Sequence, residues 1–331
     1  MNNNNKFKIV VTDSESDSID IEIKEAKKIG ASVVRGNCKS EDEVIDIAKD
    51  ADALLVNLAP ITRRVIEALN RCQVVVRYGI GVDNVDIQAA TKAGIYVVNV
   101  PTYCIDEVSS HAATLVLAIT RKLPQLDRDI RSGIWDFQRQ LPIIDLKKSV
   151  LGIVGFGNIA RLFIKKMKVF GIEQVLVYDP FVKDEDIRKF CAIPVEFDEL
   201  ITTSDIISLH TPLTQDTRHL FGEAQFRKMK KTTCIVNTAR GGIIDEQALY
   251  IALKEGSIAG AALDTMEMEP PKANNPLLEL DNVIFTPHVA FYSETAINNL
   301  HLWAIEEAIR VLTGGIPKNI VNQKVIPRRR Q

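Results

Sequence analysis

The stretch Leu151–Ala160, LGIVGFGNIA, decides the fold of this chain. Its apolar start is typical of a buried strand, and the glycines that follow predict a tight turn into a helix. Gly155 allows the sharp turn, Gly157 leaves room for a pyrophosphate beside the backbone, and Ala160 lets helix and strand pack closely. The N–H groups at the start of that helix favour a bound anion. The stretch therefore predicts a strand, a turn and a helix that hold a dinucleotide, although glycine-rich turns also occur without a ligand.

A second strand is predicted at Val175–Asp179, VLVYD, and it ends in an acid about 20 residues beyond the glycine turn. A carboxylate there can accept hydrogen bonds from the adenosine ribose. An acid at a strand end is often only a cap, but together with the turn it favours a dinucleotide site. The charge of Asp179 would repel the 2′-phosphate of NADP, and neither Pro180 nor Phe181 supplies an arginine, so we expect NAD.

The composition indicates how many domains the chain can form and which kinds of partner it excludes. With 331 residues, of which 46% are hydrophobic, the chain is long enough for two domains with separate cores. Its 41 basic and 43 acidic residues give a formal net charge of −2 and are mixed along the sequence. Such a chain has no broad positive field, so we expect no nucleic-acid partner and no membrane surface as a partner.

The cysteines and the first residues bear on the compartment. The 5 cysteines form no CxxC pair, which fits a reducing, cytoplasmic location, and no metal site is predicted. No apolar run is long enough to span a membrane, and residues 1–5 are polar where a secretory signal would be charged and then apolar. We expect those first residues to lie outside the fold.

From Lys6 to Val100, short apolar strands alternate with amphipathic helices. The strands are expected at FKIVV, SVV, ALLV, VVVRYG and IYVVNV. Strands separated by helices form a parallel α/β sheet. No glycine-rich turn follows the first strand, so this half has no obvious nucleotide site.

Two helices, expected over 106–120 and 123–132, connect this sheet to a second one that begins at Val150. Further strands are predicted at VLVYD, IISLHTP, CIVNTA, GAALD and VIFTPH, with helices between them. This pattern is typical of a doubly wound sheet, whose ligand lies beyond the carboxyl ends of the strands. A last helix is expected over 293–312, and its periodicity does not decide which sheet it covers.

Several strands of the second sheet end in polar residues at the expected ligand edge. They are His210-Thr211-Pro212, Thr238-Ala239-Arg240, Asp264 and His288. Arg240 precedes two glycines, which let the chain bend, and its planar guanidinium suits a carboxylate or an α-keto acid. The alternative is an ion pair of Arg240 with Asp245 or Glu246.

His288 ends the strand VIFTPH, at the edge where catalytic groups gather in such sheets. A carboxylate bonded to one ring nitrogen would orient the imidazole and raise its pKa, so that the other nitrogen can give a proton. Glu267 and Glu269 are both available in the loop after Asp264. The alternatives are an ordinary surface or core histidine and a solvated acidic loop.

Eight motifs carry a family resemblance: RYGIGVDNVD, NVP, GIVGFGNIA, VYDP, HTPL, NTARGGIIDE, ALDTMEMEP and TPH. In order, spacing and residue type they resemble those of the D-isomer-specific 2-hydroxyacid dehydrogenases, from Lys6 to about Val321. The resemblance implies a catalytic group of Arg240, Glu269 and His288, and it favours Glu269 over Glu267 because Glu269 precedes the proline of the family's motif. It also implies hydride transfer between NAD and a small 2-oxo or D-2-hydroxy acid, and a homodimer built on the long helix after Pro101.

The fold that the resemblance implies has two doubly wound parallel-sheet domains. A Rossmann NAD-binding domain, residues 105–293, would be inserted into a flavodoxin-like substrate domain made of residues 6–104 and 294–331. The last helix would then return to the first domain, and the cleft between the domains would be the active site.

The resemblance also assigns residues to the two ligands. Together with Gly155 of the turn, the cofactor residues would be Gly157, Asn158, Ile159, Asp179, His210, Thr211, Pro212, Thr217, Thr238, Ala239, Arg240, Asp264 and His288. The substrate residues would be Arg77, Tyr78, Gly79, Ile80, Gly81, Arg240 and Phe291. In the loop 77–81, backbone N–H groups and Arg77 would meet the substrate carboxylate; the alternative is a structural strand end with Arg77 exposed.

Two details of the sequence bear on which subgroup of the family the chain resembles. The bulky Phe291 and Tyr292 after the histidine resemble the C-terminal-binding-protein-like subgroup more than the phosphoglycerate dehydrogenases. Phe291 would either suit a compact or apolar substrate tail or pack in the core. Ser110 stands where the family commonly has an acid.

Two other functions stay open at this point. One is an NAD(H)-sensing interaction or regulatory protein with little turnover, which the C-terminal-binding-protein-like resemblance suggests. The other is an enzyme for a phosphorylated acid, which would need Arg63, Arg64 or Arg139 to face the substrate.

Overall fold

The computed structural model describes residues 6–328, so the expectation for residues 1–5 concerns a segment outside the described range. The chain divides into two compact units. The first, which we call the terminal unit, contains the residues up to Cys104 and those from Ser293 onward. The second, the central unit, is Ile105–Tyr292. Each unit is built on its own parallel sheet.

The terminal unit has a five-stranded parallel sheet with the order β2-β1-β3-β4-β5. The strands are β1 Phe7–Val11, β2 Ala31–Arg35, β3 Ala53–Val56, β4 Val74–Arg77 and β5 Tyr96–Val98. This is the flavodoxin-like order, in which helices cover both faces of the sheet. The central strand β3 is accordingly buried along its whole length.

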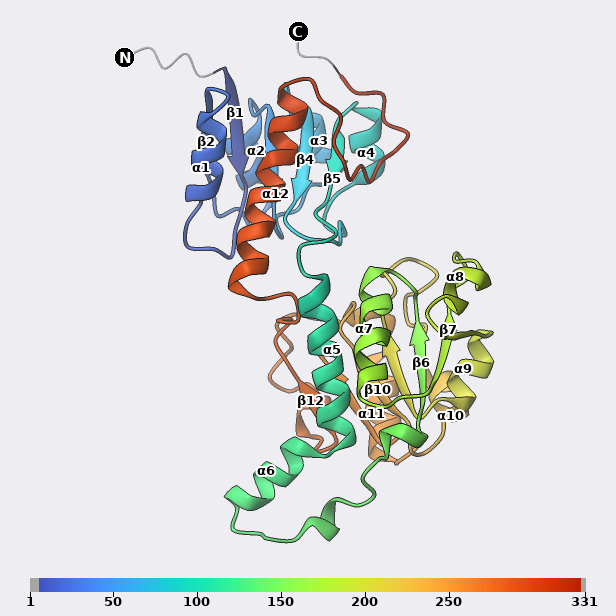
Figure 1. Ribbon diagram of the computed structural model, residues 1–331. Coiled ribbons are helices and arrows are strands. Elements are labelled where there is room, and N and C mark those ends of the chain that lie inside the picture. Colours follow the sequence, from blue (N-terminus) through green and yellow to red (C-terminus); the bar gives the residue numbers. More distant parts are fainter. Residues whose placement is uncertain (1–5, 329–331) are drawn as a thin grey trace. The chain divides into compact units, whose positions relative to one another are not determined.

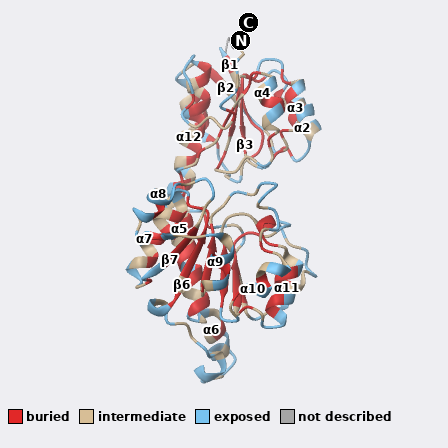
Figure 2. Ribbon diagram, turned by 90° about the vertical axis from the view of Figure 1, so that its right-hand side faces the viewer, coloured by how far each residue is buried: buried red, intermediate tan, exposed pale blue. Residues whose placement is uncertain are grey.

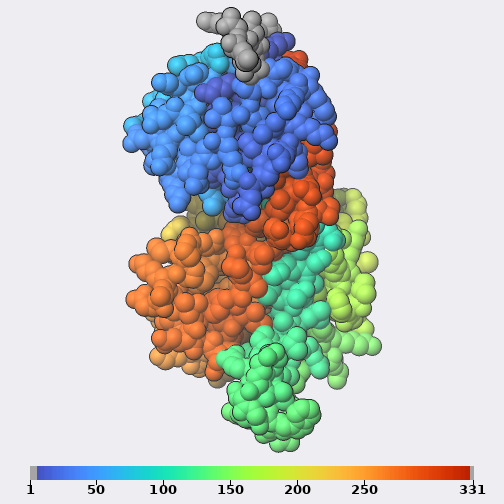
Figure 3. Space-filling model, turned by 90° about the vertical axis from the view of Figure 1, so that its left-hand side faces the viewer, coloured from blue at the N-terminus to red at the C-terminus, as the bar shows by residue number. Residues whose placement is uncertain are grey.

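The helices of the terminal unit begin with clear sequence signals. They are α1 Asp20–Lys27, α2 Glu41–Ala48, α3 Arg63–Ala68, α4 Ile87–Lys92 and α12 Glu294–Leu312. Ser40 and Glu43 form a capping box at α2, and Asp86 and Ser293 cap α4 and α12 with their side chains. The long helix α12 packs on β3 and β4 and beside α1, so segments from the two ends of the sequence lie side by side (Figures 1 and 3).

The central unit has a seven-stranded parallel sheet with the order β12-β11-β10-β9-β6-β7-β8. Its strands are β6 Val150–Val154, β7 Gln174–Tyr178, β8 Ile193–Pro194, β9 Ile206–Leu209, β10 Cys234–Asn237, β11 Gly260–Leu263 and β12 Val283–Phe285. From β8 to β11 this is the Rossmann order 3-2-1-4-5-6, to which β12 adds a strand. The predicted pair of doubly wound parallel sheets is confirmed. The sequence analysis missed β8, which is only two residues long and ends in proline.

Helices cover both faces of this second sheet and turn apolar sides toward it (Figure 2). They are α5 Ile105–Thr120, α7 Asn158–Val169, α8 Asp184–Arg188, α9 Phe197–Thr203, α10 Glu223–Lys228 and α11 Glu246–Lys254. The helix α6 Leu123–Arg131 follows α5 and is not one of them, because Gln125 is its one buried residue. In α7 the buried residues Ala160, Phe163, Ile164 and Met167 follow helical spacing and lie in one core with α5. The strand order reverses at β6, which places the ligand crevice of such a sheet beyond its carboxyl end.

Candidate active site

The glycine turn has the geometry that the sequence predicts. Gly155 has a φ of +89°, and a Cβ there would lie 2.7 Å from the carbonyl oxygen of His210, so only glycine fits. Gly157 is the N-cap of α7 and has no neighbouring heavy atom within 4 Å of an added Cβ. No side chain caps this helix, so its first N–H groups face open space at the switch point of the sheet. The turn therefore fits a pyrophosphate.

Asp179 follows β7 and is tied to the glycine turn. Its Oδ2 accepts a hydrogen bond from the N–H of Phe156 at 2.7 Å, and its Oδ1 accepts one from the N–H of Phe181 at 2.9 Å. Two backbone groups thus fix the carboxylate in the crevice. Each carboxylate oxygen has a further lone pair with which to receive a ribose hydroxyl.

The segment after β9 contains a neutral histidine. Burial lowers the pKa of His210 to about 3, its Nε2 lies 2.9 Å from the Ser208 hydroxyl, and its ring packs on Phe163 with a centroid separation of 5.0 Å. The following loop closes on itself, because the Thr217 hydroxyl donates to the carbonyl of Pro212 at 2.7 Å. These contacts give the loop beside the glycine turn a fixed shape.

The loop after β10 is held by a residue that the sequence analysis did not single out. The Asn237 side chain donates to the carbonyl of Arg240 at 2.9 Å and accepts from the N–H of Ala239 at 3.0 Å. A Cβ on Gly241 would come within 1.9 Å of the backbone of Met266, so the loop that carries Glu269 lies directly on this glycine. Gly241 therefore lets the two loops with candidate catalytic residues lie close together.

The acids suggested as ion partners of Arg240 have other roles. Asp245 caps α11 by accepting from the N–H of Ala248, and Glu246 accepts from the N–H of Glu267 at 2.6 Å and from the side chain of Asn275. The Arg240 Nη1 donates to the carbonyl of Ala239.

His288 pairs with Glu269. The His288 Nδ1 lies 2.6 Å from Glu269 Oε2, and Glu269 Oε1 accepts from the N–H of Met266 at 3.0 Å. Partial burial raises the pKa of Glu269, but the hydrogen bond and charge of His288, the Met266 N–H and the charge of Arg240 outweigh it, so the pKa lies below its usual value. The pair leaves Nε2 of His288 as the nitrogen that can exchange a proton with a ligand.

Glu267, the other acid of the same loop, points elsewhere. Its Oε1 accepts from the N–H of Glu246 at 3.1 Å, and its Oε2 lies 3.2 Å from Nε2 of His219. Glu267 therefore ties this loop to the start of α11, and Glu269 is the acid that contacts His288.

The turn that carries His288 is built around Asp264. His288 has a φ of +51°, a left-handed conformation that is uncommon for residues other than glycine. Asp264, which is only 1% exposed, accepts hydrogen bonds from this turn with its backbone carbonyl and with its side chain. Its carbonyl accepts from the N–H of His288, and its carboxylate accepts from the N–H groups of Val289 and Ala290 at 2.9 and 3.0 Å.

Two further side chains complete this support. The Thr286 hydroxyl donates to Asp264 Oδ1 at 2.5 Å and lies 3.0 Å from Nε2 of His111 on α5. Neither His111 nor Thr286 was named from the sequence. No signal in the sequence could have found His111, because 153 residues separate it from Asp264 and only the packing of α5 brings them together. The Ser110 hydroxyl, one residue earlier, receives a hydrogen bond from Lys166, which also bonds the Asp106 carboxylate.

The remaining substrate candidates have defined places. Phe291 lies beside His288, with ring centroids 6.1 Å apart. In the terminal unit, the Tyr78 side chain is buried and its N–H donates to the carbonyl of Val56. Gly79 has a φ of +133°, and the Arg77 guanidinium occupies the space that a Cβ at this glycine would need.

Known proteins of one family share this sequence and fold. Residues 113–290 match the family model described as "D-isomer specific 2-hydroxyacid dehydrogenase, NAD binding domain". The chain is 41% identical over 322 residues to the D-3-phosphoglycerate dehydrogenase of Methanocaldococcus jannaschii, covering 97% of this chain and 60% of that protein. It is 40% identical over 292 residues to the glyoxylate reductase of Korarchaeum cryptofilum, covering 87% of each chain.

A solved structure agrees with this assignment. The D-lactate dehydrogenase of Aquifex aeolicus, complexed with NAD and lactic acid, superposes with a TM-score of 0.86 at 25% identity, over 95% of this chain and 99% of that one. The chain belongs to the D-isomer-specific 2-hydroxyacid dehydrogenases, and its central unit carries the family's NAD-binding domain. It spans 60% and 56% of the lengths of the two archaeal phosphoglycerate dehydrogenases that it resembles.

Within residues 6–328, no cluster of three or more His, Cys, Asp or Glu side chains is arranged to hold a metal ion. In the same range, no helix has the length and apolar character needed to cross a membrane.

Proposed function

We propose that this protein is an NAD-dependent D-2-hydroxyacid dehydrogenase that interconverts a small 2-oxo acid and the corresponding D-2-hydroxy acid. The observation that carries the proposal is the His288–Glu269 pair, at 2.6 Å, in a unit with the glycine turn of an NAD-binding domain. A histidine oriented by a carboxylate is the proton donor and acceptor that this reaction needs.

NAD(H), when bound, supplies or accepts the hydride at C2 of the substrate. In the direction of reduction, Nε2 of His288 gives its proton to the carbonyl oxygen, so that one hydride and one proton convert the ketone to an alcohol. Glu269 orients the imidazole, while Arg240 binds the substrate carboxylate and polarises the carbonyl. The proposal for the cofactor residues rests on the open helix N-terminus at Gly157 and on the fixed carboxylate of Asp179.

We further propose that the terminal unit is the substrate domain and that its loop 77–81 binds the substrate carboxylate. The N–H of Gly79 donates to the carbonyl of Arg77 at 2.9 Å, so the N–H groups of Ile80 and Gly81 are the ones proposed to meet the substrate. Asn99 supports this role, since its side chain donates to the carbonyl of Ile80 at 2.7 Å and holds the loop in place. Phe291, beside His288, would contact the substrate tail.

The substrate is proposed to be small and unphosphorylated. Arg64 forms ion pairs with Glu41 and Asp42, and Arg139 lies 3.8 Å from Asp129, so both cations already have acidic partners. The similar proteins named glyoxylate reductase, from Korarchaeum cryptofilum, and hydroxypyruvate reductase, from Thermotoga maritima, suggest glyoxylate and hydroxypyruvate as the first compounds to try.

A cytoplasmic homodimer is the proposed form of the protein. The segment from Leu123 to Leu141, which contains α6, extends away from the sheet of the central unit (Figure 1). It exposes Leu123, Trp135, Phe137 and Leu141 by 62, 90, 61 and 56%. Such a group of exposed apolar side chains is typical of a surface that binds another chain.

The test of the proposed function is NADH oxidation with a panel of glyoxylate, hydroxypyruvate, pyruvate, 2-oxobutyrate, and branched-chain and phosphorylated 2-oxo acids. Turnover that saturates with one or more unphosphorylated acids is the expected result. Tight NADH binding without turnover of any acid, together with NADH-dependent self-association, would instead support the sensing function. A marked preference for a phosphorylated acid would contradict the proposed substrate class.

A further inference from the structure

Three buried polar side chains meet in the terminal unit, away from the residues proposed to do the chemistry. Glu22 of α1, Tyr78 after β4 and His301 of α12 are 0, 3 and 6% exposed. Glu22 Oε1 accepts a hydrogen bond from the Tyr78 hydroxyl at 2.6 Å and lies 2.5 Å from Nδ1 of His301. The rings of Tyr78 and His301 pack with centroids 4.9 Å apart. We call these three residues the Glu22 cluster.

Burying the Glu22 cluster costs free energy of folding, which is unusual for a contact that serves stability alone. Burial raises the pKa of Glu22, but the hydrogen bonds from His301 and Tyr78 and the charge of His301 outweigh it, so the pKa lies below its usual value and the side chain is ionised. Within the described residues its second oxygen, Oε2, is buried without a hydrogen-bond partner. Apolar side chains of similar size would stabilise such an interior at least as well. A role beyond stability would explain why the charge is there.

The Glu22 cluster holds Tyr78, the second residue of the proposed substrate loop 77–81. Tyr78 directly precedes Gly79, and the bond to Glu22 anchors its ring inside the unit. The backbone of the loop has anchors of its own: Tyr78 N–H donates to Val56, and the Gly79 carbonyl accepts from Val100 at 2.9 Å. Glycine has many accessible conformations, and the Gly79 N–H itself donates to the carbonyl of Arg77, so these anchors decide how the chain continues to the N–H groups of Ile80 and Gly81.

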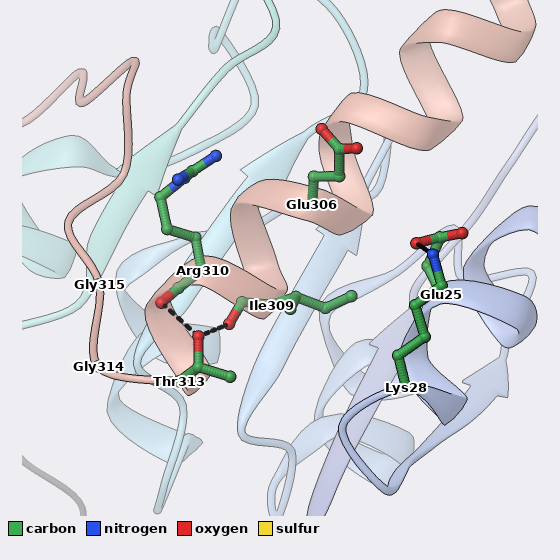
Figure 4. A pocket seen from close by; sticks show the side chains of 8 residues that line it. All are labelled: Glu25, Lys28, Glu306, Ile309, Arg310, Thr313, Gly314 and Gly315. Atoms are coloured by element: carbon green, nitrogen blue, oxygen red, sulfur yellow. Dashed lines mark hydrogen bonds and ion pairs between the residues drawn. The ribbon is translucent and has the colours of Figure 1, made fainter.

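We propose that Glu22 and His301 are positioning residues that act through Tyr78 to hold the loop Gly79–Gly81 in the geometry that binds the substrate carboxylate. This inference rests on the proposed function of the loop. It assigns a role to α12, which brings His301 from the far end of the sequence to the side of α1. The same two helices border an open surface groove whose charged residues include Glu25, Lys28, Glu306 and Arg310 (Figure 4).

The test compares Tyr78→Phe and Glu22→Gln with a matched control, Glu306→Gln. Glu306 is an exposed carboxylate on α12, so the control makes the same chemical change outside the cluster. A hydrogen bond to a charged group is worth about 1.5–3 kcal/mol, and about 1.4 kcal/mol is a factor of ten. We expect both cluster variants to raise KM for the 2-oxo acid about tenfold, with kcat and the Kd for NADH within about twofold of the wild type. The control should match the wild type.

A double variant separates positioning from general destabilisation. If both residues act on the loop through one hydrogen bond, Tyr78→Phe/Glu22→Gln should raise KM no more than Glu22→Gln alone. Independent, additive effects of the two substitutions would overturn the proposed route through Tyr78. A lower Tm with unchanged KM in both single variants would show that the cluster serves stability only.

Hydrogen exchange measures how firmly the loop is held in the absence of substrate. Amide exchange at residues 79–81 should become faster in Glu22→Gln and Tyr78→Phe and stay unchanged in Glu306→Gln. Unchanged exchange in the cluster variants would overturn the inference. If the wild type reduces none of the 2-oxo acids, the proposed function is wrong, and the exchange measurement still decides whether the cluster holds the loop.

Discussion

At the scale of single residues, the pairing of His288 with Glu269 defines what the central unit can do. The bond occupies Nδ1 and leaves Nε2 as the nitrogen for a ligand. We expect His288→Ala to lower kcat/KM for reduction at least about 100-fold, because the proton donor is lost. The Kd for NADH, measured by fluorescence, should change less than about twofold. Substantial turnover by this variant would remove His288 from the mechanism.

Glu269→Gln tests the pairing without removing the His288 side chain. An amide keeps the size of the side chain but not its charge, so kcat/KM should fall about 100-fold because the carboxylate that orients the imidazole is lost. Glu267→Gln, two residues earlier, is the matched control. A larger loss of activity in Glu267→Gln than in Glu269→Gln would show that the wrong acid has been assigned.

The same substitution has a consequence for stability at low pH. The folded protein holds the pKa of Glu269 below its usual 4.5, so the pairing stabilises the fold above that pH and is lost as the pH falls through the folded-state value. The difference in Tm between wild type and Glu269→Gln should therefore be largest near neutral pH and shrink in acid. Thermal melts across that range measure it, and a difference that grows in acid would contradict the sign of the shift.

Asp179→Ala tests the choice of cofactor. Removing the carboxylate removes both a ribose acceptor and the charge that would repel a 2′-phosphate. We expect the ratio of kcat/KM with NADH to that with NADPH to fall about tenfold. A wild-type rate that is already better with NADPH would contradict the role given to Asp179.

At the scale of elements, the turn after β12 depends on one buried carboxylate. Asp264 accepts three hydrogen bonds through its side chain, from Thr286, Val289 and Ala290. An asparagine would turn a donating amide toward at least one donor, at a cost of about 1–3 kcal/mol. We expect Asp264→Asn to lower Tm and also kcat, because His288 is displaced with its turn. An unchanged Tm would show that the turn does not need the carboxylate.

The sequence predicted elements and strand ends well, because hydrophobic period, glycine turns and caps are local signals. The predicted strands FKIVV and ALLV agree residue for residue with β1, Phe7–Val11, and β3, Ala53–Val56. The support of the site was not predicted in the same way. Asp264 was assigned to the cofactor, and the structure shows that its carboxylate bonds the turn of His288, a contact that a linear pattern does not encode. The cofactor contact of Asp264 stays a prediction.

Tyr78 is a second residue whose contacts could not be predicted from the sequence. The motif placed it among the substrate residues, but a tyrosine in a strand-end motif gives no sign of which way its ring points. The packing of α1 and α12 decides that its hydroxyl faces Glu22 and not a ligand.

At the scale of the whole molecule, the exposed apolar side chains around α6 predict an assembly. We expect Trp135→Glu combined with Phe137→Glu to shift the protein from dimer to monomer in sedimentation experiments, because two charges would be buried in the interface. Val169→Glu, at a position that is 85% exposed on α7, is the control and should leave the dimer intact. A double variant that remains dimeric would place the interface elsewhere.

The position of α12 also has a consequence for how the chain is made. The central unit is one continuous stretch, Ile105–Tyr292, so it can fold as soon as it leaves the ribosome. All five strands of the other sheet are made by then, but β3 and β4 stay uncovered on one face because α12 is still to be synthesised. Throughout the synthesis of Ile105–Tyr292, apolar strand surface stays uncovered, and this nascent chain is the stage at which a chaperone would protect the protein from aggregation.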